Sequence, residues 1–256
     1  MQFDFAKSLF ALPLLAACLV AQPSGLRSIA SPTTIDQPGA YILTSDIFIP
    51  GSAGVGIAVT ASDVTLDLNG HTITAPGNLT GAGIRIANAQ NVTVRNGNIV
   101  NALMGAVVMN SVNVRLEGLS IRATGLPASA PPPEMGIMLV QTRNSVVANN
   151  MIYNAALGIF VRGGRSFGNR IEANTITGTS MGAFGICYNP ADGDPQAPKG
   201  DLVTRNFIRG YPAAIQISSR ADYNVIAGNT LLFTMEGLLN ENSTNVAKDN
   251  TLVKLQ

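Results

Sequence analysis

The sequence predicts an all-β chain folded as a right-handed parallel β-helix of about eight coils. Two short motifs recur at a common spacing, one of the form Gly-Ile-x-Val and one of the form Asn-x-Ile or Asn-x-Leu. The composition, with 26 glycines and no tryptophan, favours strands joined by tight turns. A unit of this length cannot bury its apolar face alone, so successive units are expected to stack into one continuous core.

The first motif marks one strand in each coil. It occurs, with variations, at 56–59, 83–86, 106–109, 136–139, 158–161, 185–188, 214–217 and 237–240. Because strand side chains alternate, the second residue points inward and the third outward. We therefore expect Ile137, Ile159, Ile186 and Ile215 to stack inside the rod. The predicted outward row is Ala58, Arg85, Val108, Met138, Phe160, Cys187, Gln216 and Leu239.

The asparagines predict ladders at the corners between strands. One row consists of Asn150, Asn174, Asn206, Asn229 and Asn250, at steps of 21 to 24 residues apart from one longer step. A second row is predicted at Asn91, Asn113, Asn144, Asn169, Asn224 and Asn245, with Asp201 in the corresponding place of its coil. Asparagine tolerates the left-handed backbone region and its amide can bond the next coil, which suits it to a solenoid corner.

The first residues have the pattern of an export signal. Lys7 precedes an apolar run over 8–20, and small residues follow, so residues 1–21 are expected to direct export. Two processing alternatives remain open: a lipobox ending at Cys18, which would become a lipid anchor, or ordinary cleavage before Gln22. We expect residues 22–55 to form an N-terminal cap segment and residues 56–256 the β-helix. The expected location is periplasmic, cell-surface or secreted.

Composition excludes several classes of function. The formal net charge is +1 and the basic residues are scattered, which gives no electrostatic footprint for nucleic acid. The N-terminal apolar run is too short to span a membrane, and no other run reaches its hydrophobic length. His71 is the only histidine, so the chain contains no histidine cluster for a metal and no histidine-based catalytic group beyond that residue.

Two insertions interrupt the repeat, at 124–134 and 189–200, and loops on a rigid solenoid often build its binding sites. In the second insertion, Asp192 and Asp194 could hold Ca²⁺, and Lys199 could act as a base. The alternative is a solvated loop whose acids only keep the turn soluble. Arg162, which lies on the outward face, is a second candidate base.

The outward face of the fourth to sixth coils is the predicted contact surface for an acidic polysaccharide. It would consist of Met138, Phe160, Arg162 and Tyr188, with Arg162 pairing with a uronate. An apolar row on an outward face also has a simpler explanation, which is that the two insertions fold over it.

The segments VTLDLNGHTI (64–73) and NVTVRNGNIV (91–100), together with the Gly-Ile-x-Val repeats, resemble the bacterial right-handed β-helix repeat family. The wider superfamily includes pectate lyases and polygalacturonases. The segment IDQPGAYILTSDI (35–47) is similar to the first segment of that family's copper-maturation periplasmic members. The resemblance implies the scaffold and says little about activity, because one such fold hosts lyases, hydrolases and proteins without chemistry.

Three functions follow from this reading. The first is an exported protein that binds carbohydrate or acts as an accessory scaffold. The second, by analogy with the superfamily, is a polysaccharide lyase-like enzyme acting on uronic-acid glycans with Ca²⁺. The third is a purely structural or assembly module.

Overall fold

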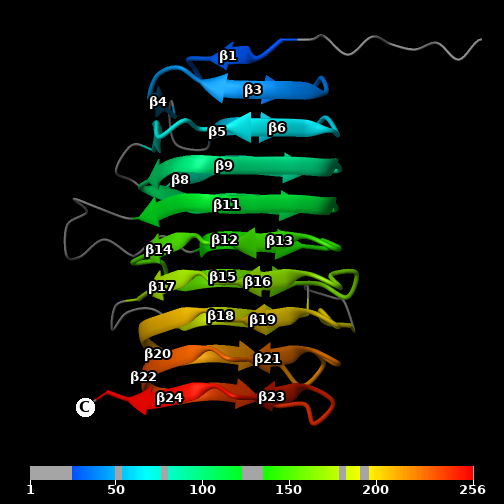
Figure 1. Ribbon diagram of the computed structural model, residues 1–256, viewed down its shortest axis with the longest axis vertical. Coiled ribbons are helices and arrows are strands. Elements are labelled where there is room, and N and C mark those ends of the chain that lie inside the picture. Colours follow the sequence, from blue (N-terminus) through cyan, green and yellow to red (C-terminus); the bar gives the residue numbers. More distant parts are fainter. Residues whose placement is uncertain are drawn as a thin grey trace, which may run out of the picture.

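The computed structural model describes residues 25–49, 54–75, 80–122, 135–178, 183–190 and 196–255. The export signal and Cys18 lie outside the described residues, as does the whole of the 124–134 insertion. Every regular element among the described residues is a β-strand, and the strands stack coil upon coil from β1 at one end to β24 at the other (Figure 1). All pairings between these strands are parallel, as predicted for a β-helix.

The strands form three stacks that run along the rod. Stack A contains β2 (Thr33–Ile35), β5 (Val55–Val59), β8 (Thr80–Ala87), β10 (Ala102–Met109), β12 (Met135–Val140), β15 (Leu157–Arg162), β18 (Phe184–Asn189) and the C-terminal parts of β20 (Phe207–Ile217) and β22 (Thr230–Asn240). From β5 to β22 it has eight strands, one for each predicted coil.

Stack B contains β1 (Arg27–Ile29), β3 (Gly39–Leu43), β6 (Val64–Asp67), the N-terminal parts of β9 (Gln90–Val100) and β11 (Val112–Arg122), β13 (Val146–Ala148), β16 (Arg170–Glu172), β19 (Leu202–Thr204), β21 (Val225–Ala227) and β23 (Val246–Lys248). Stack C contains β4 (Ile47–Phe48), β7 (Thr72–Thr74), the C-terminal parts of β9 and β11, β14 (Met151–Tyr153), β17 (Thr175–Thr177), the N-terminal parts of β20 and β22, and β24 (Thr251–Lys254).

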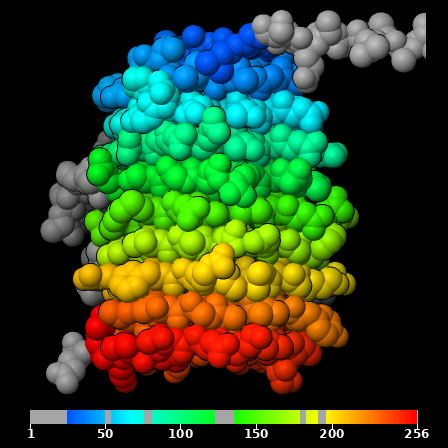
Figure 2. Space-filling model, viewed as in Figure 1, coloured from blue at the N-terminus to red at the C-terminus, as the bar shows by residue number. Residues whose placement is uncertain are grey.

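The core is a column of aliphatic side chains between the three stacks. Ile137, Ile159, Ile186 and Ile215 are register neighbours in stack A and all are fully buried, which confirms their predicted positions. The glycine before each isoleucine allows close packing between coils. A Cβ on Gly158 would collide with the carbonyl oxygen of Gly185 in the next coil. Consecutive coils therefore lie flat on one another, and Figure 2 shows them as layers.

The asparagine ladder between stacks B and C is confirmed. Asn150, Asn174, Asn206 and Asn229 are 1% exposed, and each donates from its backbone N–H and from Nδ2 to Oδ1 of the next asparagine over 2.9–3.0 Å. The donor groups on one coil thus bond directly to the acceptor on the next. We call this row the B/C ladder.

The second predicted row is wrong as a single ladder and proves to be two adjacent rows. Asn91, Asn113 and Asn144 have positive φ and are exposed at the corner between stacks A and B. One position further on, Asn169, Asp201, Asn224 and Asn245 are buried and hydrogen bonded in series; we call them the A/B ladder. Asparagine suits both neighbouring positions, so residue type alone did not separate the rows.

No helix among the described residues is long and apolar enough to span a membrane.

Candidate functional site

The outer surface of stack A is apolar over most of its length, as predicted, although one member of the predicted row is wrong. Val107, and not Val108, is the register partner of Arg85 and Met138, because the repeat in that coil begins at Gly105. Val108 points into the core and is fully buried. Met138 lies on the outer surface and is partly exposed.

Phe160 and Arg162 lie together on the outer surface of β15. The guanidinium carbon of Arg162 is 6.0 Å from the centre of the Phe160 ring, and its Nε donates to the carbonyl of Pro190 over 3.4 Å. Phe160 is only 8% exposed. Its ring therefore offers little surface for stacking on a sugar.

The placement of Tyr188 on this face is wrong. In β18 the outward residue is Cys187, so the next residue points inward, and Tyr188 packs between Val161 and Ile217 in the core with no exposed surface. Its Oη is buried without a hydrogen bond of ordinary geometry. Burial raises the pKa of Tyr188 well above its usual value, and the nearby Asp201 carboxyl adds to this rise.

The predicted Ca²⁺ ligands Asp192 and Asp194 lie outside the described residues. Among the residues that are described, no group of three or more His, Cys, Asp or Glu could hold a metal ion. Lys199 is described and exposed, but it lies at the corner between stacks A and B and forms a bridge with Phe167 of the preceding coil. It is therefore displaced from the face that carries Phe160 and Met138.

The structure brings polar and cationic side chains together at this A/B corner. A pocket of about 460 Å³ is lined by Asn88, Asn110, Gln141, Arg143 and Arg165. Asn88 and Asn110 come from two consecutive coils, Gln141 and Arg143 from the third, and Arg165 from the fourth. We call it the amide–arginine pocket. The three amide residues form one vertical row, because Asn88, Asn110 and Gln141 all have positive φ and each backbone N–H donates to the coil below.

The cations of this pocket have no acidic partner. Arg143 and Arg165 are both exposed, none of the lining residues is acidic, and neither arginine forms an ion pair with any described residue. The Arg143 guanidinium carbon lies 5.8 Å from the centre of the Phe167 ring, which is 40% exposed. A flat apolar ring thus lies beside an unpaired cation on an accessible corner.

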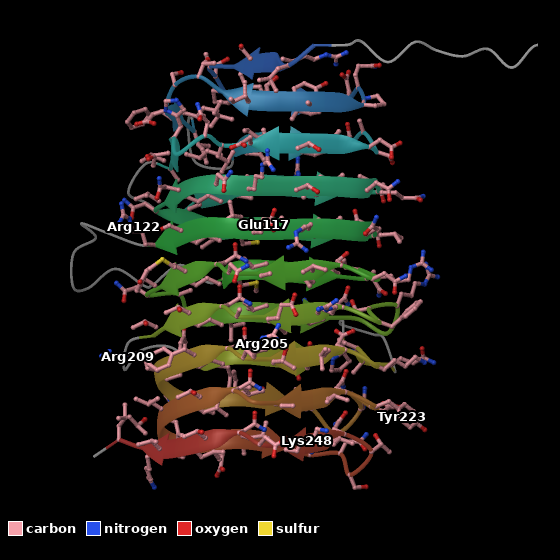
Figure 3. The ribbon with its side chains drawn as sticks, in the orientation of Figure 1. Glu117, Arg122, Arg205, Arg209, Tyr223 and Lys248 are labelled. Carbon is pink, nitrogen blue, oxygen red and sulfur yellow. The ribbon has the colours of Figure 1, made fainter. Side chains whose placement is uncertain are left out.

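The corner continues toward the C-terminal end as a second polar pocket. It has a volume of about 300 Å³ and its charged lining residues are Lys199, Arg220 and Asp222. Tyr223, beside Asp222, is 66% exposed and lies at the right-hand edge of the molecule in Figure 3. One acid among two bases leaves this second pocket less cationic than the first.

Charges on the outer surface of stack B are arranged differently. Arg95 pairs with Asp67 at 3.0 Å, Arg115 with Glu117 at 2.6 Å, and Arg170 with Glu172 at 2.9 Å. Glu117, Arg205 and Lys248 mark this face in Figure 3. The charges here largely neutralise one another, so the A/B corner is the better place for an anionic ligand.

Sequence reasoning did not find the amide–arginine pocket. Its residues are spread over 78 positions and meet only when the register of four coils is known. A usable signal existed, because Asn88, Asn110 and Gln141 each follow the Gly-Ile-x-Val strand directly or within one residue, and Arg143 and Arg165 follow shortly after.

Comparison with known proteins agrees with the architecture. The family model described as "Right handed beta helix region" matches residues 45–231. No curated protein matches the sequence. Among solved structures, DFA-IIIase from Arthrobacter chlorophenolicus A6 in complex with DFA-III superposes with a TM-score of 0.66 at 14% identity, over 88% of this chain and 64% of that one.

Two further structures are similar over most of the chain. The surface protein and adhesin PfbA of Streptococcus pneumoniae has a TM-score of 0.63 at 10% identity, over 90% of this chain and 76% of that one. An alginate lyase from Paenibacillus sp. str. FPU-7 has a TM-score of 0.56 at 14% identity, over 90% of this chain and 98% of that one. At these identities the likeness concerns the fold alone. Since the family model covers most of the chain, the protein belongs to the right-handed β-helix family.

Proposed function

We propose that this is an exported carbohydrate-binding protein whose amide–arginine pocket binds an acidic polysaccharide. One observation carries the proposal: Arg143 and Arg165 lie exposed in a pocket without any acidic lining residue, whereas most of the arginines on the outer surface of stack B are paired with acids. The N-terminal signal supports the exported location.

The chemistry of the pocket fits a uronate. A guanidinium presents a planar pair of N–H donors that matches a carboxylate, and bonds of this kind are among the stronger ones in proteins. The side-chain amides of Asn88 and Asn110 can donate to and accept from sugar hydroxyls. The exposed Phe167 ring offers an apolar surface for one face of a pyranose.

The similar structures support a glycan ligand by analogy. They include an alginate lyase and a bacterial surface adhesin, so this scaffold serves both catalysis and adhesion in other proteins. We favour binding because the described part of the pocket holds cations and amides and no carboxylic acid. The lyase-like alternative needs a base, and Lys199, two coils from Arg143, is the candidate that lies on the same corner.

Binding of tri-galacturonate to the purified mature protein, measured by isothermal titration calorimetry, tests the proposal. Each of Arg143→Gln and Arg165→Gln should weaken binding about tenfold, because each removes one charge-assisted contact. Arg95→Gln is the matched control, since it removes an exposed arginine that is already paired with Asp67, and it should leave binding unchanged. The methyl-esterified trisaccharide should bind poorly to all forms.

Equal loss in the Arg95 and Arg143 variants, or no preference for the free acid over the ester, would refute the pocket as the site. Titrations with and without Ca²⁺ test the predicted role of Asp192 and Asp194. Absorbance of unsaturated product during long incubation with acidic polysaccharides distinguishes a lyase from a binding protein.

A further inference from the structure

We propose a second binding site, for an alkyl carboxylate, on the outer surface of stack A. The site lies between β5 and β12, on a different face from the amide–arginine pocket, and it does not depend on the proposed glycan function. Its ligand has a flexible apolar chain and one anionic head group.

The described residues form a pocket of about 300 Å³ on this surface. Its apolar lining consists of Val55, Ala82, Met104, Val107, Met109 and Met138, which come from four successive strands of stack A. Concave sites that are largely apolar with a few placed polar groups are the usual form of a small-molecule site.

Methionine is concentrated on this face. Of the six methionines among the described residues, Met104, Met109 and Met138 line the pocket, and Met135 lies in register with Met104 on the neighbouring strand. All four are partly exposed. Unbranched thioether side chains adapt to irregular and flexible apolar ligands, which suits this wall to an alkyl chain.

Arg85 supplies the charge. Its side chain lies in the lining, is exposed, and makes no hydrogen bond or ion pair with any described residue. Its register neighbours in stack A are Ala58 and Val107, which cannot neutralise it. Among described residues in the outward columns of stack A, the one acid is Glu236, which lies in the last coil. An isolated guanidinium beside an apolar pocket is complementary to an anionic head group.

The test uses decanoate and decyltrimethylammonium, which share a chain and differ in the sign of the head group. Calorimetry with the full mature chain, below the critical micelle concentration, should show that decanoate binds at least tenfold more tightly. Arg85→Gln should weaken decanoate binding at least tenfold. Arg122→Gln, which removes an exposed arginine from stack C, should have no effect.

A charge-reversed variant guards against a simple loss of folding. Arg85→Gln combined with Met138→Glu should lose decanoate and gain decyltrimethylammonium, because the pocket wall now carries a carboxylate. Absence of decanoate binding to the wild type, equal affinity for the two probes, or an unaffected Arg85→Gln variant would overturn the proposal. A wild-type dimer in sedimentation that Met138→Glu dissociates would instead assign the face to a second copy of the chain, and would overturn it too.

Discussion

The two buried ladders differ by a single kind of group. In the B/C ladder every member is an asparagine, and each amide donates to the coil below while it accepts from the coil above. In the A/B ladder Asp201 replaces an asparagine. It accepts from the backbone and Nδ2 of Asn169, but toward the next coil only its backbone N–H bonds Asn224, at 2.9 Å.

The difference shows what an amide contributes to a repeat. An amide is both donor and acceptor, whereas a carboxylate only accepts, so an ionised Asp201 interrupts the chain of side-chain bonds. Burial raises the pKa of Asp201 from 3.8 to about 7, although Asn169 and Tyr188 partly oppose this rise. A protonated Asp201 regains a donor. The A/B ladder is therefore sensitive to pH near neutrality and the B/C ladder is not.

Breaking the neutral ladder should have the largest effect. Asn174→Leu leaves the backbone N–H and Nδ2 of Asn150 and the carbonyl of Val147 without their partner, all in a buried setting. We expect a loss of about 3 to 5 kcal/mol in the free energy of unfolding, measured with urea. Asn98→Leu, at a partly buried site with one bond to the Gly70 carbonyl, should cost less than about 1 kcal/mol. Similar losses in the two variants would argue against the ladder.

Repairing the interrupted ladder should stabilise the protein in a pH-dependent way. Because the folded-state pKa of Asp201 lies above its unfolded value, the stability it confers is fully present below pH 3.8 and is lost as pH rises toward about 7. Asp201→Asn removes this loss, so the gain over wild type should be small at pH 4 and reach at most about 4 kcal/mol at pH 8. Thermal unfolding at several pH values measures it. A gain that does not change with pH would contradict an ionisable Asp201.

A charge outside the ladders should matter least. Arg95→Ala removes an exposed ion pair with Asp67 on the outer surface of stack B, and we expect a change of about 0.2 to 1 kcal/mol that vanishes at high salt. Urea unfolding at low and high salt provides the measurement. A change in unfolding free energy as large as that expected for Asp201→Asn would mean that burial does not explain the difference between Asp67 and Asp201.

The repeat predicted the fold because one sequence pattern determines which residues lie side by side in adjacent coils and also which side chains point into the core. Ile137 and Ile159 could be placed from the motif alone, since a parallel stack aligns equivalent residues. The register error at Val108 arose because Gly105-Ala106 and Ala106-Val107 both match a small residue before an apolar one. The outward placement of Tyr188 was wrong because Tyr188 occupies the fourth position of the Gly-Ile-x-Val pattern, and strand alternation puts that position inside.

The candidate site was less predictable than the fold. Arg143 and Asn88 lie 55 positions apart, and their meeting depends on how many residues each corner turn contains. The motif sets the strands but leaves these turns free to vary. Arg162 was predicted on the same outward face as Phe160 and does lie beside that ring on stack A, but this face is away from the corner that holds the amide–arginine pocket.

The axial hydrogen bonds also determine how the rod carries load. Bonds between parallel strands run from coil to coil, so a pull applied between the two ends passes through every junction in series and the weakest junction yields first. With Asp201 ionised, the junction toward Asn224 has lost a side-chain link that the neighbouring junctions keep. Within the A/B ladder this junction therefore has the fewest side-chain bonds above about pH 7, and a pull along the rod meets the least side-chain resistance there.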